Sequence, residues 1–319
     1  MSRILVTARI FPETRAALDT LGAVVANEAI EPWSAAEIRD RAAGCTAMLA
    51  FMTDRVDAAL LDAAPSLRLI ACALKGYDNI DVEACRARGV AVSIVPDLLT
   101  APTAELAIGL LIGLGRHIAS GDALVRGGGF AGWRPVLYGQ GLDGARVAIL
   151  GLGALGSAIA ARLAPFGCRL VGVDPMRDAP GVLRMPLAPA LEAADAVIAA
   201  LPLTPSTRHF LDAESLALLP RHALLVNIGR GSTVCEAAVL AALEAGRLGG
   251  YAADVFESED WALPDRPPDI DPALRAHPRT LFTPHLGSAV ERVRRAIEMR
   301  AVANIEDHLA GRAPRDAIA

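Results

Sequence analysis

The sequence of 319 residues lacks a long hydrophobic run, a dense basic cluster and any C-x-x-C motif. The longest apolar stretch, residues 106–114, is too short to cross a bilayer, so no membrane partner is expected. The net charge is −5, which argues against nucleic acid as a partner. Because no basic segment followed by an apolar one opens the chain, we expect no signal peptide and a cytoplasmic location.

The cysteines give no disulfide framework. There are five of them, an odd number, and their spacing is not typical of a metal site. We therefore expect reduced cysteines that behave as small buried hydrophobes, and we predict no metal site. The cysteines are Cys45, Cys72, Cys85, Cys168 and Cys235.

The sequence does contain short β-branched runs that alternate with helical patterns. This alternation predicts an α/β fold with doubly wound parallel sheets. Strands are expected at residues 4–7, 23–26, 47–51, 69–73, 90–94, 145–150, 170–173, 196–200, 223–227, 251–254 and 280–282. Helices are expected at residues 12–21, 35–43, 58–62, 102–117 and 289–309, with a Gly-rich connection at 127–144 and a loop at 255–278.

The length favours two domains. The last helix has little to pack on in the second half of the chain, so we expect it to cross back to the first half. The predicted domains are therefore residues 1–98 with 291–319, and residues 99–290. A cleft between two such domains is the natural place for a ligand.

A glycine-rich turn follows the strand at residues 145–150. Gly151 allows a tight turn, Gly153 allows close approach of a pyrophosphate, and Gly156 allows the next helix to pack close to the strand. The following strand ends at Asp174, which is placed to accept hydrogen bonds from ribose hydroxyls and favours NAD over NADP. Arg177 lies nearby and leaves tolerance of NADP open.

Three polar residues follow three later strands. Arg230 comes after the strand at 223–227, the acidic run 254–260, which contains Glu259, after 251–254, and His285 after 280–282. Open parallel sheets place their ligand sites at the carboxyl ends of the strands, so these side chains are expected to meet. Arginine can hold two oxygens of an anion, and a carboxylate can orient a histidine that moves a proton. The sequence therefore predicts hydride transfer between a small anionic substrate and a nicotinamide.

The motifs occur in the order G-x-G-x-x-G at 151–156, N-x-x-R-G at 227–231, D-V-F-x-x-E at 254–259 and P-H at 284–285. In this order they resemble the D-isomer-specific 2-hydroxyacid dehydrogenase family over nearly the whole chain. The resemblance implies that residues 1–98 and 291–319 form a flavodoxin-like substrate-binding domain and residues 99–290 a Rossmann NAD-binding domain. It also implies a homodimer, catalytic Arg230, Glu259 and His285, and the following contacts with NAD: Gly151, Gly153, Ala154, Leu155, Gly156, Asp174, Thr103, Pro202, Asp254 and His285.

Further segments resemble the phosphonate dehydrogenase branch of that family, whose members oxidise phosphite. These segments are residues 47–52, 73–79, 95–100, 130–135, 249–261 and 283–290. The branch implies a small substrate, phosphite, held by the charge of Lys75 and enclosed by apolar side chains. The residues implied to bind the substrate are Lys75, Gly76, Met52, Leu99, Trp133, Tyr138, Ser288 and Arg294.

The expected reaction is therefore NAD-dependent oxidation of phosphite to phosphate, with Lys75 and Arg230 holding the anion and His285 taking a proton from the attacking water. One alternative is a 2-hydroxyacid dehydrogenase of the glyoxylate or hydroxypyruvate type, in which Arg230 holds a carboxylate. Another is an NADH-sensing transcriptional corepressor, which the complete set of Arg230, Glu259 and His285 argues against.

Overall fold

A computed structural model describes residues 2–319, which form two compact units. Unit 1 contains the chain up to Leu99, Trp261–Pro264 and Ala289–Ala319, and unit 2 contains Thr100–Asp260 and Asp265–Ser288. The expected boundaries at 98/99 and 290/291 differ from these by one or two residues. The expected boundaries assign Trp261–Pro264 to the NAD-binding domain, but this segment belongs to unit 1.

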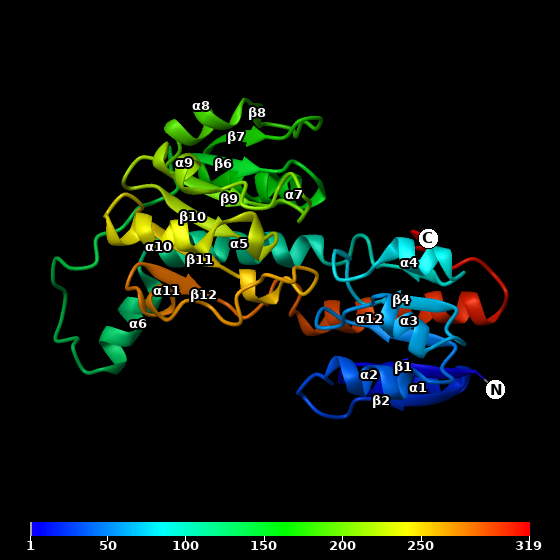
Figure 1. Ribbon diagram of the computed structural model, residues 1–319. Coiled ribbons are helices and arrows are strands. Elements are labelled where there is room, and N and C mark those ends of the chain that lie inside the picture. Colours follow the sequence, from blue (N-terminus) through cyan, green and yellow to red (C-terminus); the bar gives the residue numbers. More distant parts are fainter. Residues whose placement is uncertain (1) are drawn as a thin grey trace. The chain divides into compact units, whose positions relative to one another are not determined.

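Unit 1 is built on a five-stranded sheet in the order β2-β1-β3-β4-β5, and all of its pairings are parallel (Figure 1). Two neighbouring strands inside the sheet, β3 and β4, are buried along their whole length, because helices cover both faces of a parallel sheet. The strands are β1 (Arg3–Val6), β2 (Ala23–Ala26), β3 (Ala47–Ala50), β4 (Leu69–Cys72) and β5 (Ala91–Ser93).

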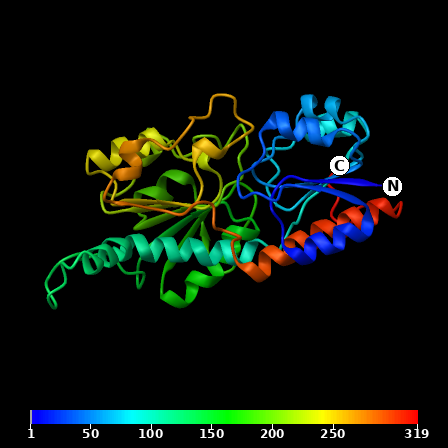
Figure 2. The same ribbon diagram turned by 90° about the horizontal axis from the view of Figure 1, so that it is seen from below.

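The helices of unit 1 lie on two faces of this sheet. One core cluster joins the sheet to α2 (Ala35–Ala42), α3 (Ala58–Ala63) and α4 (Val82–Ala87). The other joins it to α1 (Pro12–Leu21) and α12 (Glu291–Leu309), which run side by side in Figure 2. The last helix of the chain therefore completes the core of the unit that contains the first strand.

Unit 2 is built on a seven-stranded parallel sheet in the order β12-β11-β10-β9-β6-β7-β8. Its first strand, β6, lies between β7 and β9, so the strand order reverses at its carboxyl end. This switch point is where open α/β sheets bind ligands. The strands are β6 (Arg146–Leu150), β7 (Arg169–Val173), β8 (Leu183–Arg184), β9 (Ala196–Ala199), β10 (Leu224–Asn227), β11 (Gly250–Ala253) and β12 (Thr280–Phe282).

Alternate residues of β6 enter different cores, as the two-residue period of a strand requires. Val147 and Ile149 join one cluster, which contains α5 (Thr100–Gly115) and α7 (Ala154–Leu163). Ala148 and Leu150 join the other. That cluster contains the helices α8 (Leu187–Glu192), α9 (Ala213–Ala217), α10 (Glu236–Glu244) and α11 (Pro272–Ala276).

The predicted fold class is confirmed by these two sheets. The sequence pattern did not predict the helices α4, α8, α9 and α10. It also missed α6 (Ile118–Arg126), whose residues are all at least partly exposed and so lack an apolar stripe facing a core. It also missed β8, which has only two residues, and the short helix α11 within the expected loop. Short elements of this kind form through tertiary contacts that no local pattern records.

No single helix in residues 2–319 is long and apolar enough to cross a membrane, although the bent pair α5 and α6, at 61°, passes on length and composition.

Candidate active site

The turn after β6 has the geometry of a dinucleotide site. Gly151 has a φ of +89°, a conformation that favours glycine. A Cβ on Gly156 would lie 1.9 Å from the Gly151 carbonyl oxygen, so only glycine lets α7 start this close to the strand. Gly153 is the N-cap of α7 and no side chain caps the helix, so the N–H groups around Ala154 and Leu155 face outward for an anion. The turn therefore fits the pyrophosphate of a dinucleotide.

Asp174 lies beside this turn, directly after β7. Its carboxylate accepts hydrogen bonds from the backbone N–H groups of Leu152, Met176 and Arg177 at 2.8–2.9 Å. Burial alone would raise the pKa of Asp174, but these bonds and the Arg177 charge outweigh it and lower the pKa. An ionised carboxylate retains lone pairs for ribose hydroxyls. The Arg177 side chain reaches over Gly153, with Nη1 2.9 Å from where a Cβ would be.

Arg230 follows β10 in a turn that is fixed by a buried asparagine. The Asn227 amide donates to the carbonyl oxygens of Arg230 and Gly231 at 3.0 and 3.3 Å, and its oxygen accepts from Gly229 N–H. A Cβ on Gly231 would lie 1.9 Å from the carbonyl carbon of Phe256, so the two strand-end loops touch only because Gly231 has no side chain. The half-buried Arg230 is therefore held at the carboxyl edge of the sheet by its main chain.

Glu259 and His285 form a hydrogen-bonded pair at the same edge. Glu259 closes the 3-10 turn η3 (Glu257–Glu259), where Oε1 accepts from Phe256 N–H at 2.8 Å. Its other oxygen, Oε2, lies 2.8 Å from His285 Nδ1, and both side chains are a little under one-third exposed. The structure thus brings together the predicted carboxylate and histidine, which are 26 residues apart in sequence.

The loop that carries His285 is fixed by Asp254, which is buried at the end of β11. Asp254 Oδ1 accepts from Thr283 Oγ1 and Leu286 N–H, both at 2.6 Å, and Oδ2 accepts from Gly287 N–H at 2.8 Å. Burial is the largest influence on this carboxyl and raises its pKa. Asp254, which the resemblance assigned to the cofactor, therefore positions the histidine loop.

Three more predicted residues lie in unit 2. The Thr103 hydroxyl on α5 is 3.1 Å from the position of a Cβ on Gly287, which places it beside the histidine loop. Ser288 ends that loop and is half-buried. Pro202 follows β9, and its carbonyl oxygen accepts from Thr207 Oγ1 at 2.6 Å.

Unit 1 places another group of predicted residues at the carboxyl ends of its own strands. Met52 follows β3, Lys75 and Gly76 follow β4, and all three are half-buried. The loops are tied together by Asn79, whose amide donates to the carbonyl oxygens of Phe51 and Asp54. Leu99 packs against the core cluster on the side of α1 and α12.

A buried carboxyl group and a half-buried arginine hold this edge of unit 1. The Asp54 carboxyl accepts from Phe51 N–H at 2.7 Å and from the Thr7 hydroxyl, and burial raises its pKa to about 6. Arg294 on α12 donates from Nη1 to the Ala73 carbonyl oxygen at 3.4 Å. Burial lowers the pKa of Arg294, and the charge of Glu298, one turn further along α12, partly offsets this. Arg294 thus lies behind the Lys75 loop, within the same unit.

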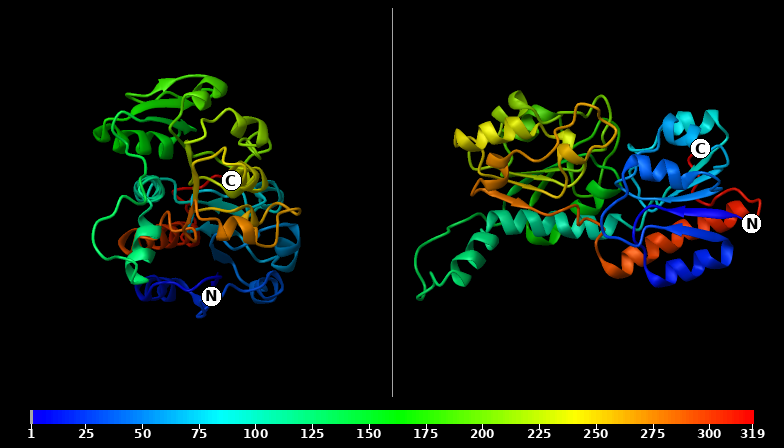
Figure 3. Two further views of the ribbon diagram at one scale, coloured as in Figure 1. Left: turned by 90° about the vertical axis from the view of Figure 1, so that its left-hand side faces the viewer. Right: turned by 60° about the horizontal axis from the view of Figure 1, so that its bottom comes forward.

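Within unit 2, Trp133 and Tyr138 are not brought to Arg230. They are 83% and 76% exposed and belong to an extended segment after α6. That segment rejoins unit 2 at Gln140, which bonds to Gly115 and to His222, the latter just before the start of β10. The segment therefore leaves from the amino edge of the unit 2 sheet, opposite the edge that carries Arg230, and Figure 3 shows it extending away from the sheet.

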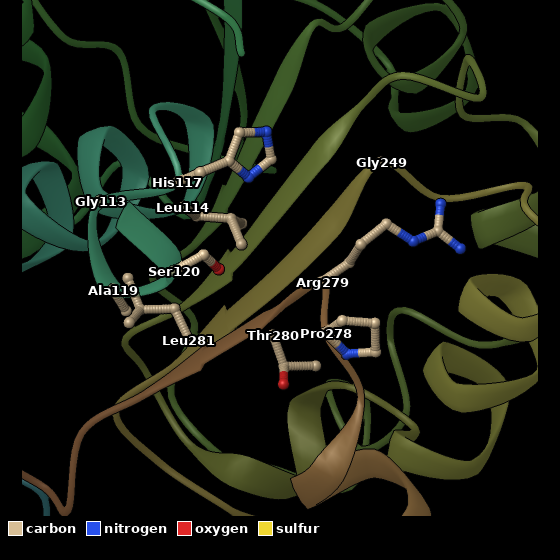
Figure 4. A pocket seen from close by; sticks show the side chains of 10 residues that line it. All are labelled: Gly113, Leu114, His117, Ala119, Ser120, Gly249, Pro278, Arg279, Thr280 and Leu281. Atoms are coloured by element: carbon tan, nitrogen blue, oxygen red, sulfur yellow. The ribbon is translucent and has the colours of Figure 1, made fainter. Parts of the chain in front are cut away.

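A hollow at this amino edge is not the candidate active site. It lies between the end of α5 and the start of β12, with His117 and Leu281 in its lining (Figure 4). The arginine in the lining of this hollow is Arg279. Its guanidinium donates to the carbonyl oxygens of Leu243 and Leu248 and so links segments within unit 2.

The fold and these residues are those of a dinucleotide-dependent oxidoreductase, and comparison with known proteins supplies the family. The family model for the D-isomer specific 2-hydroxyacid dehydrogenase, NAD binding domain, matches residues 108–287. Glyoxylate reductase from Korarchaeum cryptofilum is 37% identical over 278 residues, which cover 85% of this chain and 82% of that protein. Glyoxylate reductase from Pyrococcus furiosus is 36% identical, with 81% and 78% covered.

Solved structures agree with this assignment. A protein from Thermus thermophilus superposes with a TM-score of 0.92 at 33% identity and covers 99% of this chain and 100% of its own. An NADPH-dependent glyoxylate/hydroxypyruvate reductase from Sinorhizobium meliloti, in complex with NADP and malonate, has a TM-score of 0.86 at 32% identity, with 100% and 97% covered. The chain belongs to the D-isomer specific 2-hydroxyacid dehydrogenase family and is an NAD-dependent dehydrogenase.

Sequence reasoning missed the residues that support the catalytic trio. The Asn227 and Thr283 side chains stood inside the quoted motifs, so the motif spacing could have indicated them. Glu236 and Glu257 accept hydrogen bonds from each other's backbone N–H groups at 2.9 and 2.7 Å, although they are 21 residues apart. No local pattern could have predicted that pair.

Proposed function

We propose that the protein interconverts a small 2-oxo acid and its 2-hydroxy acid, with glyoxylate or hydroxypyruvate as the 2-oxo acid. The observation that supports this proposal most directly is the hydrogen-bonded Glu259–His285 pair. It lies at the carboxyl ends of the strands in unit 2, where Arg230 also lies. The relatives named glyoxylate reductase support this substrate class over phosphite.

Each residue of the trio has one task in the proposed reaction. Arg230 binds the substrate carboxylate through two parallel N–H bonds. An ionised carboxylate only accepts hydrogen bonds, so Glu259 keeps the hydrogen of His285 on Nδ1 and leaves Nε2 to exchange a proton with the substrate oxygen. NAD, when bound, supplies the hydride acceptor, or the hydride donor in its reduced form.

Phosphite is a second candidate substrate, and one feature of the chain favours it. Lys75 is the only lysine among the 31 basic residues of the sequence. A compact ammonium suits a small, multiply charged oxyanion, whereas arginine suits planar carboxylates. The presence of the single lysine at the end of β4, in a chain that uses arginine elsewhere, supports a specific role for its ammonium group.

The two candidates are separated by one substrate comparison. NADH consumption with glyoxylate and hydroxypyruvate should exceed NAD reduction with phosphite, with both rates followed by the absorbance of NADH. Faster turnover with phosphite would replace the first candidate by the second.

Lys75→Gln provides an independent test of the phosphite candidate. If phosphite is the substrate, this variant should lose about 10²-fold or more in kcat/KM for phosphite, because a charge-assisted bond to the anion is removed. Under the glyoxylate proposal the same variant should change kcat/KM for glyoxylate by less than about tenfold. Arg55→Gln, on the exposed surface of unit 1, is the matched control for loss of one positive charge.

We also infer a homodimer in which a second copy covers the arm, defined as residues 118–138. Eight large hydrophobic side chains of the arm are exposed: Ile118, Leu124, Val125, Phe130, Trp133, Val136, Leu137 and Tyr138. A monomeric protein rarely exposes so many apolar side chains in one segment. The double variant Phe130→Asp, Trp133→Asp should elute as a monomer with light scattering, whereas Ile30→Asp, at a site 81% exposed outside the arm, should remain dimeric. A dimer of unchanged stability in the double variant would show that the arm is not the dimer interface.

A further inference from the structure

Three metal-ligating side chains of different kinds meet in unit 2, and none of them belongs to the catalytic trio. They are His209, Cys235 and Glu257, and one ligand atom from each lies within 4.8 Å of the other two. All three residues are half-buried. We propose that they bind one Zn²⁺ ion, with water as the fourth ligand.

The backbone around these three ligands is fixed. His209 N–H donates to the Ser232 carbonyl oxygen at 2.7 Å, and Cys235 N–H donates to the Leu211 carbonyl oxygen at 2.8 Å, so the two segments are paired. Glu257 is tied to the start of α10 by its reciprocal bonds with Glu236. Three segments of unit 2 are thereby held together before any ion binds.

The spacing is close to that of a tetrahedral zinc site. Zinc bonds of 2.0–2.3 Å place neighbouring ligand atoms about 3.3–3.7 Å apart. His209 Nε2 is 3.1 Å from Glu257 Oε2, and the largest separation in the group is within 4.8 Å. Rotation of the Cys235 side chain and a shift of about 1 Å would complete the geometry.

The chemistry of the ligands selects the ion. A thiolate, an imidazole and a carboxylate together suit zinc, whereas calcium and magnesium require oxygen ligands alone. Further negative charge near the ligands comes from Asp260, whose Oδ2 accepts from Ser232 N–H. The neighbouring cation, Arg208, is 2.7 Å from Asp265, so that carboxylate is its nearest partner. A divalent cation would offset this charge.

The proposal replaces the expectation from the cysteine spacing that the chain has no metal site. Cys235 is expected to be a small hydrophobe because the five cysteines are odd in number and form no C-x-x-C pair. The partners come from positions 26 and 22 residues away along the chain, which no ligand-spacing motif covers. The short pairing of Leu211 with Val234 is what brings His209 to Cys235.

Cobalt is the probe for this site, because a Co²⁺–thiolate bond gives a charge-transfer absorption that oxygen and nitrogen ligands do not. The purified full-length protein should show this band with one equivalent of Co²⁺, and Zn²⁺ should displace it. Cys235→Ser should abolish the band and weaken Zn²⁺ binding at least about 100-fold, since loss even of supporting groups costs 10–100-fold. Serine is also a good helix N-cap, so α10 should remain folded.

Cys168→Ser is the matched control, because Cys168 is the other half-buried cysteine of unit 2 and bonds only to the Leu142 carbonyl oxygen. It should keep the band. His209→Asn preserves the left-handed backbone at φ +49°, and Glu257→Gln preserves an acceptor for Glu236 N–H. Each should weaken Zn²⁺ binding at least about tenfold. A wild-type spectrum without the thiolate band, or an unchanged band in Cys235→Ser, would overturn the proposal.

Discussion

Replacement of His285 by asparagine is expected to lower kcat by about 10²–10⁴-fold, the usual contribution of a general acid or base. His285 has a φ of +54°, which asparagine adopts more readily than most residues, so the loop should keep its shape. Its backbone N–H, which donates to the Asp254 carbonyl oxygen at 2.9 Å, is unaffected by the substitution. The loss should therefore come from the missing imidazole and not from unfolding.

Steady-state kinetics with glyoxylate, together with NADH binding measured by fluorescence, checks this result. NADH affinity should stay within about threefold of the wild type, because the glycine turn of α7 is untouched. His222→Asn is the matched control, since the His222 side chain is exposed and its Nε2 lies 2.8 Å from Asp195 Oδ1. Turnover of the His285 variant at a level near that of this control would mean that another group moves the proton.

Replacement of Arg230 by alanine is expected to lower kcat/KM by about 10²–10³-fold, as removal of one charge-stabilising donor does in other enzymes. The turn itself should keep its shape, because the Asn227 amide donates to the main-chain carbonyl oxygens of Arg230 and Gly231, which the substitution leaves in place. Arg230→Lys should recover only part of the activity, since an ammonium keeps the charge but cannot make two parallel bonds to a carboxylate.

Addition of guanidinium ion to Arg230→Ala gives a sharper test of the same residue. The free ion can occupy the space left by the side chain, so activity should rise with guanidinium concentration in this variant and not in the wild type. Arg126→Ala, which removes an exposed arginine paired with Asp122 on α6, is the matched control and should behave as the wild type. If Arg230→Ala kept near-normal kcat/KM, the substrate anion would have to bind elsewhere.

The hydrogen-bond partners of the acidic segment after β11 could not be predicted from the sequence. Glu257, Glu259 and Asp260 lie within four residues, and composition alone gives no reason to separate them. In the structure each has a different partner: Glu257 bonds to His209 and to Glu236 N–H, Glu259 to His285, and Asp260 to Ser232 N–H. Only the family resemblance singled out Glu259 beforehand, because the partners are 21 to 48 residues away in sequence.

Local patterns in the sequence were enough to predict the parallel α/β fold, the dinucleotide turn and the position of Arg230, Glu259 and His285 after strands. These features are local: they depend on strand and helix periodicity and on glycines that the backbone requires at fixed positions. Tertiary structure alone decided that Asp254 holds the histidine loop, that Trp133 lies at the far edge of its unit, and that Cys235 meets His209. Such contacts depend on which strands become neighbours in the sheet. The sequence around one segment does not show which distant segment will pack against it.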